Sequence, residues 1–166
     1  MSTYVLIHGA GHDGSAWDGV IKHLNDLGHK AFGPTAAGHG RRVCKAVTHA
    51  ESTDNTVTQP FQLWREPFIN DADFATASWA YDLLTPEPFQ QLLEPLDLKN
   101  FYTLDTPKSY LACTEDTVTL PGEWAWHPRM SSRLGLHRLV EMPGSHEVIF
   151  SNPTGLAEKL IEAGRD

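Results

Sequence analysis

Two turns near the C-terminal end of this 166-residue chain carry residue types that catalyse proton transfer. Asp116 follows the apolar run 109–113, and His146 follows the run 137–142. An imidazole acts as a general base when a carboxylate fixes one ring nitrogen and leaves the other available. If both runs are neighbouring parallel strands, their carboxyl ends meet at one sheet edge. A His146–Asp116 catalytic pair is therefore one interpretation, but spacing alone favours the other, in which His146 is a turn histidine and Asp116 a helix-capping carboxylate.

A third turn, His8-Gly9-Ala10-Gly11, follows the apolar run 4–7. Backbone N–H groups at such a turn point to the same sheet edge and can stabilise negative charge that develops during acyl transfer. We expect Ala10, with Gly11 beside it, to be the oxyanion donor. A tight turn that needs glycine is an equally good explanation of His8-Gly9.

The sequence offers few nucleophiles and no metal site. Ser15 lies near the oxyanion turn, Ser145 adjoins His146, and Cys113 ends a strand, but each also fits a structural role as helix cap, turn residue or small core side chain. We expect no cofactor and no metal, because the spacings of the histidines do not match a ligand set; those considered are His12, His39 and His127.

Hydrophobic periodicity places these turns in an α/β framework. A strand at 4–7, a helix from Trp17 to Leu27 closed by Gly28, and a strand at 29–34 make a βαβ unit with parallel strands. Strands at 109–113 and 137–142 flank a short helix at 128–134. Asn152 as cap and Pro153 in the first turn begin the last helix.

The composition changes in residues 47–106, which contain many large aromatic side chains. The hydrophobic period of this part predicts a linker with a helical lid, with helices at 71–84 and from Thr85-Pro86 to Leu96. No strand-like run occurs in this part. We therefore divide one structural domain into a core part at 1–46, the lid at 47–106 and a second core part at 107–166. Large aromatic side chains in and after the lid suit a substrate pocket or, equally, a plain core: Trp64, Trp79, Tyr81 and Trp124.

Composition excludes several function classes. A net charge of -8 gives no basic surface for nucleic acid, and no apolar run is long enough to cross a membrane. Cys44 and Cys113 form neither a disulfide framework nor a ligand spacing. The start of the chain does not have the pattern of a signal peptide, so we expect a cytoplasmic protein.

In order along nearly the whole chain, the motifs resemble those of the α/β-hydrolase family: His8–Gly11 with Trp17, Ala37–Gly40, Thr114–Asp116 and Gly144–Glu147. The chain is most similar to the branch of esterases related to hydroxynitrile lyases. From Trp64 onward it looks closest to bacterial esterases that hydrolyse methyl carbamates such as carbendazim. The resemblance implies hydrolysis of a small aryl or alkyl ester or carbamate, with His146 and Asp116 as base and orienting acid.

The family's nucleophile elbow, Gly-x-Ser-x-Gly, occurs nowhere in the sequence. The resemblance therefore implies an internal deletion near Asp54-Asn55 that removes two central strands, the serine and the second oxyanion donor. Such a sheet either closes from the first strand onto the third or leaves edges that a homodimer fills. The alternative function is a non-catalytic or lyase-like binding remnant of the same fold.

Overall fold

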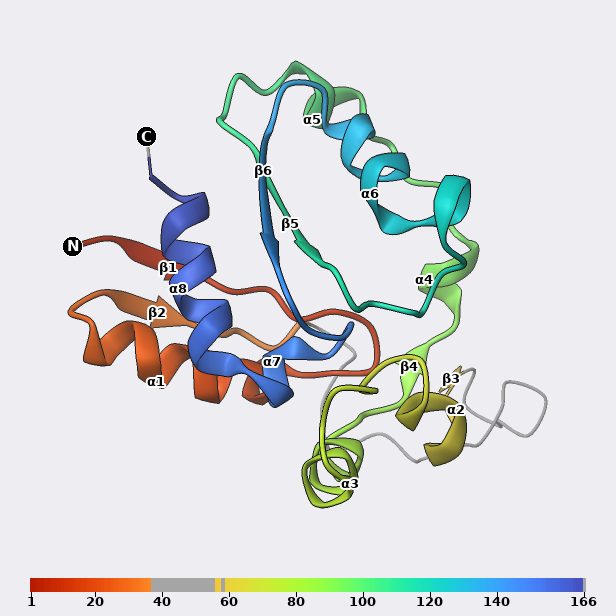
Figure 1. The fold of residues 1–166 in the computed structure, drawn as a ribbon. Coiled ribbons are helices and arrows are strands. Elements are labelled where there is room, and N and C mark those ends of the chain that lie inside the picture. The colour runs from red at the N-terminus through yellow and green to blue at the C-terminus, as the bar shows by residue number, and fades with distance from the viewer. Residues whose placement is uncertain (37–55, 58, 166) are drawn as a thin grey trace.

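The computed structural model describes residues 1–36, 56–57 and 59–165 of the chain. The proposed junction at Asp54-Asn55, the Ala37–Gly40 motif and Cys44 lie outside the described residues. Within them the chain is a truncated α/β fold, with parallel strand pairs flanked by helices (Figure 1).

The N-terminal βαβ unit forms as the sequence predicts. Strand β1 (Thr3–Val5) pairs in parallel with β2 (Lys30–Phe32). Between them lie the 3-10 helix η1 (Gly14–Trp17) and helix α1 (Asp18–Asp26). Val20 and Leu24 are fully buried, whereas Leu27 is exposed because α1 ends before it.

The C-terminal half contains the second parallel pair. Strand β5 (Ser109–Cys113) pairs with β6 (Arg138–Met142) over the whole length of both strands. The last helix, α8 (Pro153–Ala163), begins at Asn152, whose side chain accepts a hydrogen bond from the Gly155 N–H. The segment between β5 and β6 breaks into several short helices, and one more precedes α8: η2 (Gly122–Trp124), α6 (Trp126–Arg129), η3 (Ser131–Leu134) and α7 (Val148–Ser151).

The lid differs from the prediction in several ways, among them two short helices, at 61–65 and 99–103, that were not predicted. It contains a small antiparallel pair, β3 (Thr56–Val57) with β4 (Glu87–Pro88), where no strand was expected. Thr85 does not cap a long helix, because residues 87–88 form β4 and the next helix begins only at Gln90; the Thr85 N–H donates to the Gly11 carbonyl oxygen. The lid helices are α2 (Phe61–Arg65), α3 (Phe74–Asp82), α4 (Gln90–Leu93) and α5 (Lys99–Thr103).

One core joins the two βα halves. Leu6, Val20, Leu24 and Met142 are buried together, and α1 and α8 lie side by side against the strands (Figure 1). A second cluster under the lid contains Trp64, Ile69, Ala77 and Phe150 among its buried members.

The two parallel pairs do not join into one sheet. Among the described residues, β1 pairs only with β2 and β5 pairs only with β6. The four-stranded sheet that would form if the first strand closed onto the third is therefore not present there, and both β1 and β5 keep an unpaired edge.

Candidate active site

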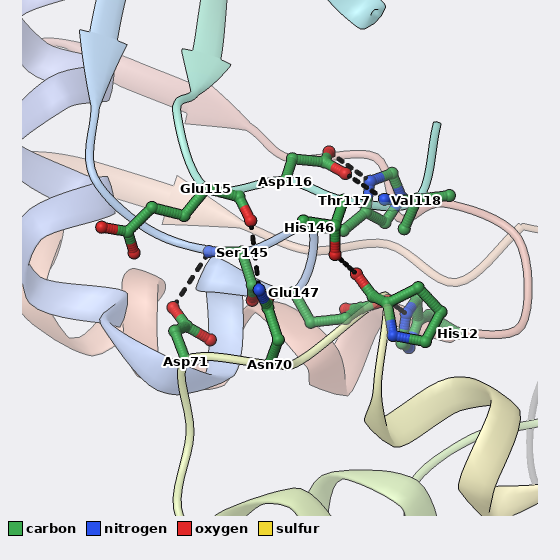
Figure 2. Close-up of polar contacts among 11 residues, drawn as sticks. His12, Asn70, Asp71, Glu115, Asp116, Thr117, Val118, Ser145, His146 and Glu147 are labelled. Atoms are coloured by element: carbon green, nitrogen blue, oxygen red, sulfur yellow. Dashed lines mark hydrogen bonds and ion pairs between the residues drawn. The ribbon is translucent and has the colours of Figure 1, made fainter. Parts of the chain in front are cut away.

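The structure brings His146 and Asp116 together. His146 Nδ1 lies 2.7 Å from Asp116 Oδ2, as Figure 2 shows. The other Asp116 oxygen accepts from the Val118 N–H at 3.0 Å, which holds the carboxylate in place. The second ring nitrogen, Nε2, is then the one available for proton transfer. The His146 side chain is 35% exposed, so this nitrogen belongs to an accessible group.

The β5–β6 ladder explains why these side chains meet. It continues past both strands, with Thr114 N–H donating to the Met142 carbonyl and Glu115 N–H to the Gly144 carbonyl. The two strand tips therefore run together into their turns. Gly144 has a φ of +135°, and a Cβ there would lie 2.7 Å from Val148 Cγ2, so the turn that presents His146 requires glycine.

A carboxylate from the lid supports this turn. Asp71 Oδ2 accepts from the Ser145 N–H at 3.0 Å (Figure 2). The same oxygen accepts from Ser151 Oγ at 2.7 Å. Burial raises the pKa of Asp71, but the hydrogen bonds from Ser145 and Ser151 outweigh burial and hold the pKa below its ordinary value. Asp71 therefore binds as a carboxylate and fixes the residue before His146.

Aromatic rings enclose the imidazole. Trp126 stacks on the His146 ring at a centroid distance of 5.7 Å, and Phe68 meets it edge-on at 5.3 Å. Burial lowers the pKa of His146, but the hydrogen bond and charge of Asp116, with a smaller contribution from Glu147, raise the pKa above its ordinary value. Sequence reasoning missed Phe68 as a neighbour of His146, because its spacing in the lid carries no sign of this contact.

The His146–Asp116 pair opens onto a cavity of about 700 Å³, which we call the histidine cavity. Its wall includes β5 residues 110–113, Trp126 and Glu141 besides His146 and Asp116. An opening of this size accommodates a small organic molecule beside the imidazole.

The oxyanion turn lines a different, smaller cavity of about 280 Å³, here called the lid cavity. Ala10 and Gly11 share its wall with Trp64, Leu84 and Glu87. Gly11 N–H does not face an empty position, because it donates to Glu87 Oε2 at 2.8 Å. Ala10 N–H donates to no acceptor within the described part of the chain.

The predicted substrate-binding aromatics are not gathered in one pocket. Trp64 is buried and lines the lid cavity, and Tyr81 packs on it while donating to the Gln59 carbonyl at 2.7 Å. Trp79 packs on Phe150 in another hollow, and Trp124 is exposed on η2. Phe68 lines the lid cavity and also touches His146, so it lies where the two cavities approach each other.

None of the candidate nucleophiles is placed to react. Ser15 Oγ donates to Asp13 at 2.5 Å in a capping contact, and Ser145 is fully buried. Burial first, and then the nearby Asp116, raises the pKa of the Cys113 thiol to about 11, which leaves it protonated and weakly nucleophilic at neutral pH.

A second histidine–carboxylate pair was not expected. His12 Nε2 lies 3.1 Å from Glu147 Oε1, and both residues are buried and line the lid cavity. Within the described residues, no group of three or more His, Cys, Asp or Glu side chains is placed to hold a metal ion. None of the helices in that part of the chain is long and apolar enough to cross a membrane.

Neither the family models nor the curated proteins contain a match to this chain. Solved structures do match. An extracellular α/β-hydrolase from a Paenibacillus species, described as sharing structural and functional homology with tobacco salicylic acid binding protein 2, is 30% identical, with 100% of both chains covered and a TM-score of 0.89.

More distant structures share the fold. A methylesterase from Arabidopsis is 15% identical, covers 98% of each chain and has a TM-score of 0.71. A variant of polyneuridine aldehyde esterase is 13% identical, with 99% of this chain and 100% of that chain covered and a TM-score of 0.73. The Paenibacillus structure is 30% identical to this chain over the whole length of both. The parallel strands and the turns that hold His146 and Asp116 agree with this match. The chain therefore belongs to the α/β-hydrolase family.

Proposed function

We propose that this protein hydrolyses small aryl or alkyl carboxylesters or methyl carbamates, with His146 as the general base and Asp116 as the residue that orients it. The 2.7 Å contact between His146 Nδ1 and Asp116 Oδ2 carries the proposal, since it leaves Nε2 as the basic nitrogen beside an open cavity. Solved relatives described as methylesterases and as pyrethroid hydrolases support the ester-hydrolase class.

The proposed reaction uses water, because no described serine or cysteine is placed as a nucleophile. His146 Nε2 takes a proton from water while the water oxygen forms a bond to the carbonyl carbon. The tetrahedral oxyanion is stabilised by the backbone N–H groups of the turn at Ala10 and Gly11, which requires the substrate carbonyl to reach from the histidine cavity past Phe68 into the lid cavity. The bond to the leaving oxygen then breaks, and the imidazolium returns the proton to that oxygen.

The loss of His146 tests the proposal. We expect His146→Ala to lower kcat/KM for a chromogenic acetate such as 4-nitrophenyl acetate by about a hundredfold or more, the usual contribution of a general base. His137→Ala is the matched control, because His137 precedes β6 at the opposite end of that strand. Equal turnover by wild type and His146→Ala, purified alike, would refute hydrolysis at this pair and favour a binding role for the fold.

The substrate class and the cellular location are also part of this proposal. We expect the protein to act on small esters or carbamates and to bind neither nucleic acids nor membranes. Parallel assays on aryl acetates and methyl carbamates compare the two substrate classes directly. A cytoplasmic location remains the expectation from the start of the sequence, which does not have the pattern of a signal peptide. Fractionation of the source cells followed by immunodetection tests this location.

A further inference from the structure

A buried lid carboxylate occupies the proposed oxyanion turn. Gly11 N–H donates to Glu87 Oε2 at 2.8 Å, and Glu87 lies in the wall of the lid cavity together with Ala10 and Gly11. Gly11 has a φ of +76°, a conformation in which glycine is favoured and which sets the direction of its N–H.

The contact is part of a larger attachment between lid and turn. Thr85 N–H donates to the Gly11 carbonyl at 2.7 Å, and Thr85 Oγ1 donates to the His12 carbonyl at 3.3 Å. Strand β4, which begins at Glu87, is held in turn by β3 through the Val57–Glu87 pair. The lid backbone therefore fixes where the Glu87 carboxylate can lie.

The Glu87 carboxylate lies where the oxygen of a tetrahedral intermediate would have to bind. A backbone N–H that is to stabilise the negative oxygen of a tetrahedral intermediate must be able to donate to it. Here a negative oxygen of the protein already accepts that hydrogen bond, and its charge repels a second negative oxygen at the same place. Within the described residues, Ala10 N–H donates to no acceptor, so it stays open to an oxyanion.

We propose that Glu87 is a built-in competitor for the oxyanion turn, which limits hydrolysis until a substrate or a movement of the lid displaces it. The inference rests on the proposed function in one respect, that this turn binds the oxyanion. Glu87 then controls which substrates react, because the acyl group must displace a carboxylate from Gly11 N–H in an apolar cavity.

Removal of the carboxylate should activate the enzyme. We expect Glu87→Ala to raise kcat/KM for 4-nitrophenyl acetate by about tenfold or more, since one oxyanion donor is worth about a hundredfold or more. Glu87→Gln keeps an acceptor oxygen but loses the charge, so its gain is smaller. Glu94→Ala is the control, because it removes one lid carboxylate that contacts Gln90 and not the turn. If Glu87 only clamps the lid, Glu87→Ala loses activity and thermal stability together, which would overturn the proposal.

A second measurement does not depend on turnover. In ¹H–¹⁵N spectra the Gly11 amide proton of the wild type should lie downfield, move upfield in Glu87→Ala and return on addition of sodium acetate, while Glu94→Ala leaves it in place. An unchanged Gly11 resonance in Glu87→Ala refutes the contact itself. If the resonance moves while His146→Ala keeps full turnover, the contact stands and the proposed hydrolysis at His146 fails.

Discussion

At the scale of single residues, the pKa of His146 connects structure to rate. Burial lowers this pKa, and the hydrogen bond and charge of Asp116 raise it by more, so the net pKa lies above the ordinary value of 6.5. A general base works only when it is unprotonated. A raised pKa therefore moves the acid limb of the activity profile toward higher pH.

This gives a prediction about pH dependence. The rate of ester hydrolysis should rise with pH through a midpoint above 6.5 and then level off. Asp116→Asn removes the charge that raises the pKa, so the midpoint should fall while the plateau rate also drops because the ring is less well oriented. Glu147→Gln should lower the midpoint less, since Glu147 contributes least to the shift. A midpoint that does not move in Asp116→Asn contradicts the pairing.

At the scale of elements, helix α8 shows how a local signal supports the site. Asn152 accepts from the Gly155 N–H at 2.9 Å, and Pro153 occupies the first turn. The helix packs against α1 and buries Leu156 and Ala157 in the core that also holds Met142, the last residue of β6. A weaker helix start would therefore loosen the strand that leads to His146.

We expect Asn152→Ala to lower the free energy of unfolding by about 1 kcal/mol, because the helix loses its side-chain cap. Asn152→Asp keeps an acceptor at the same position and should stay close to wild type. Urea unfolding followed by circular dichroism measures both. Equal stability of Asn152→Ala and Asn152→Asp would show that the cap contributes nothing.

At the scale of the whole molecule, the two parallel pairs have strand edges without a partner and exposed apolar side chains within the part of the chain that the structure describes. Tyr4 and Leu6 face the core with α1, whereas Val5 and Ile7 are each 63% exposed and Phe32 on the neighbouring strand is exposed beside them. β1 has no partner on its second edge within the described residues. An unpaired edge next to exposed apolar side chains favours pairing with another strand.

We therefore expect a homodimer in which a second copy covers this face. Sedimentation velocity should show a weight-average mass that rises with protein concentration, and Val5→Lys should reduce this association. Leu136→Lys is the control, because Leu136 is 98% exposed at a separate turn. A monomer of 18.4 kDa at every concentration would contradict the expectation.

Local sequence signals determined most of the core. The apolar runs predicted β1, β5 and β6, and Gly28 and Asn152 marked helix ends that the structure contains. These features depend on backbone conformation and hydrophobic period over a few residues, so no distant contact is needed to predict them.

Only the tertiary structure decided how distant turns meet. It placed His146 Nδ1 beside Asp116, put Trp126 and Phe68 on the imidazole, and separated the histidine cavity from the lid cavity. It also set Glu87 on Gly11 N–H, a contact between residues 76 positions apart. Such contacts depend on how strands, lid and loops pack in three dimensions, and residue type and spacing along the chain do not encode those distances.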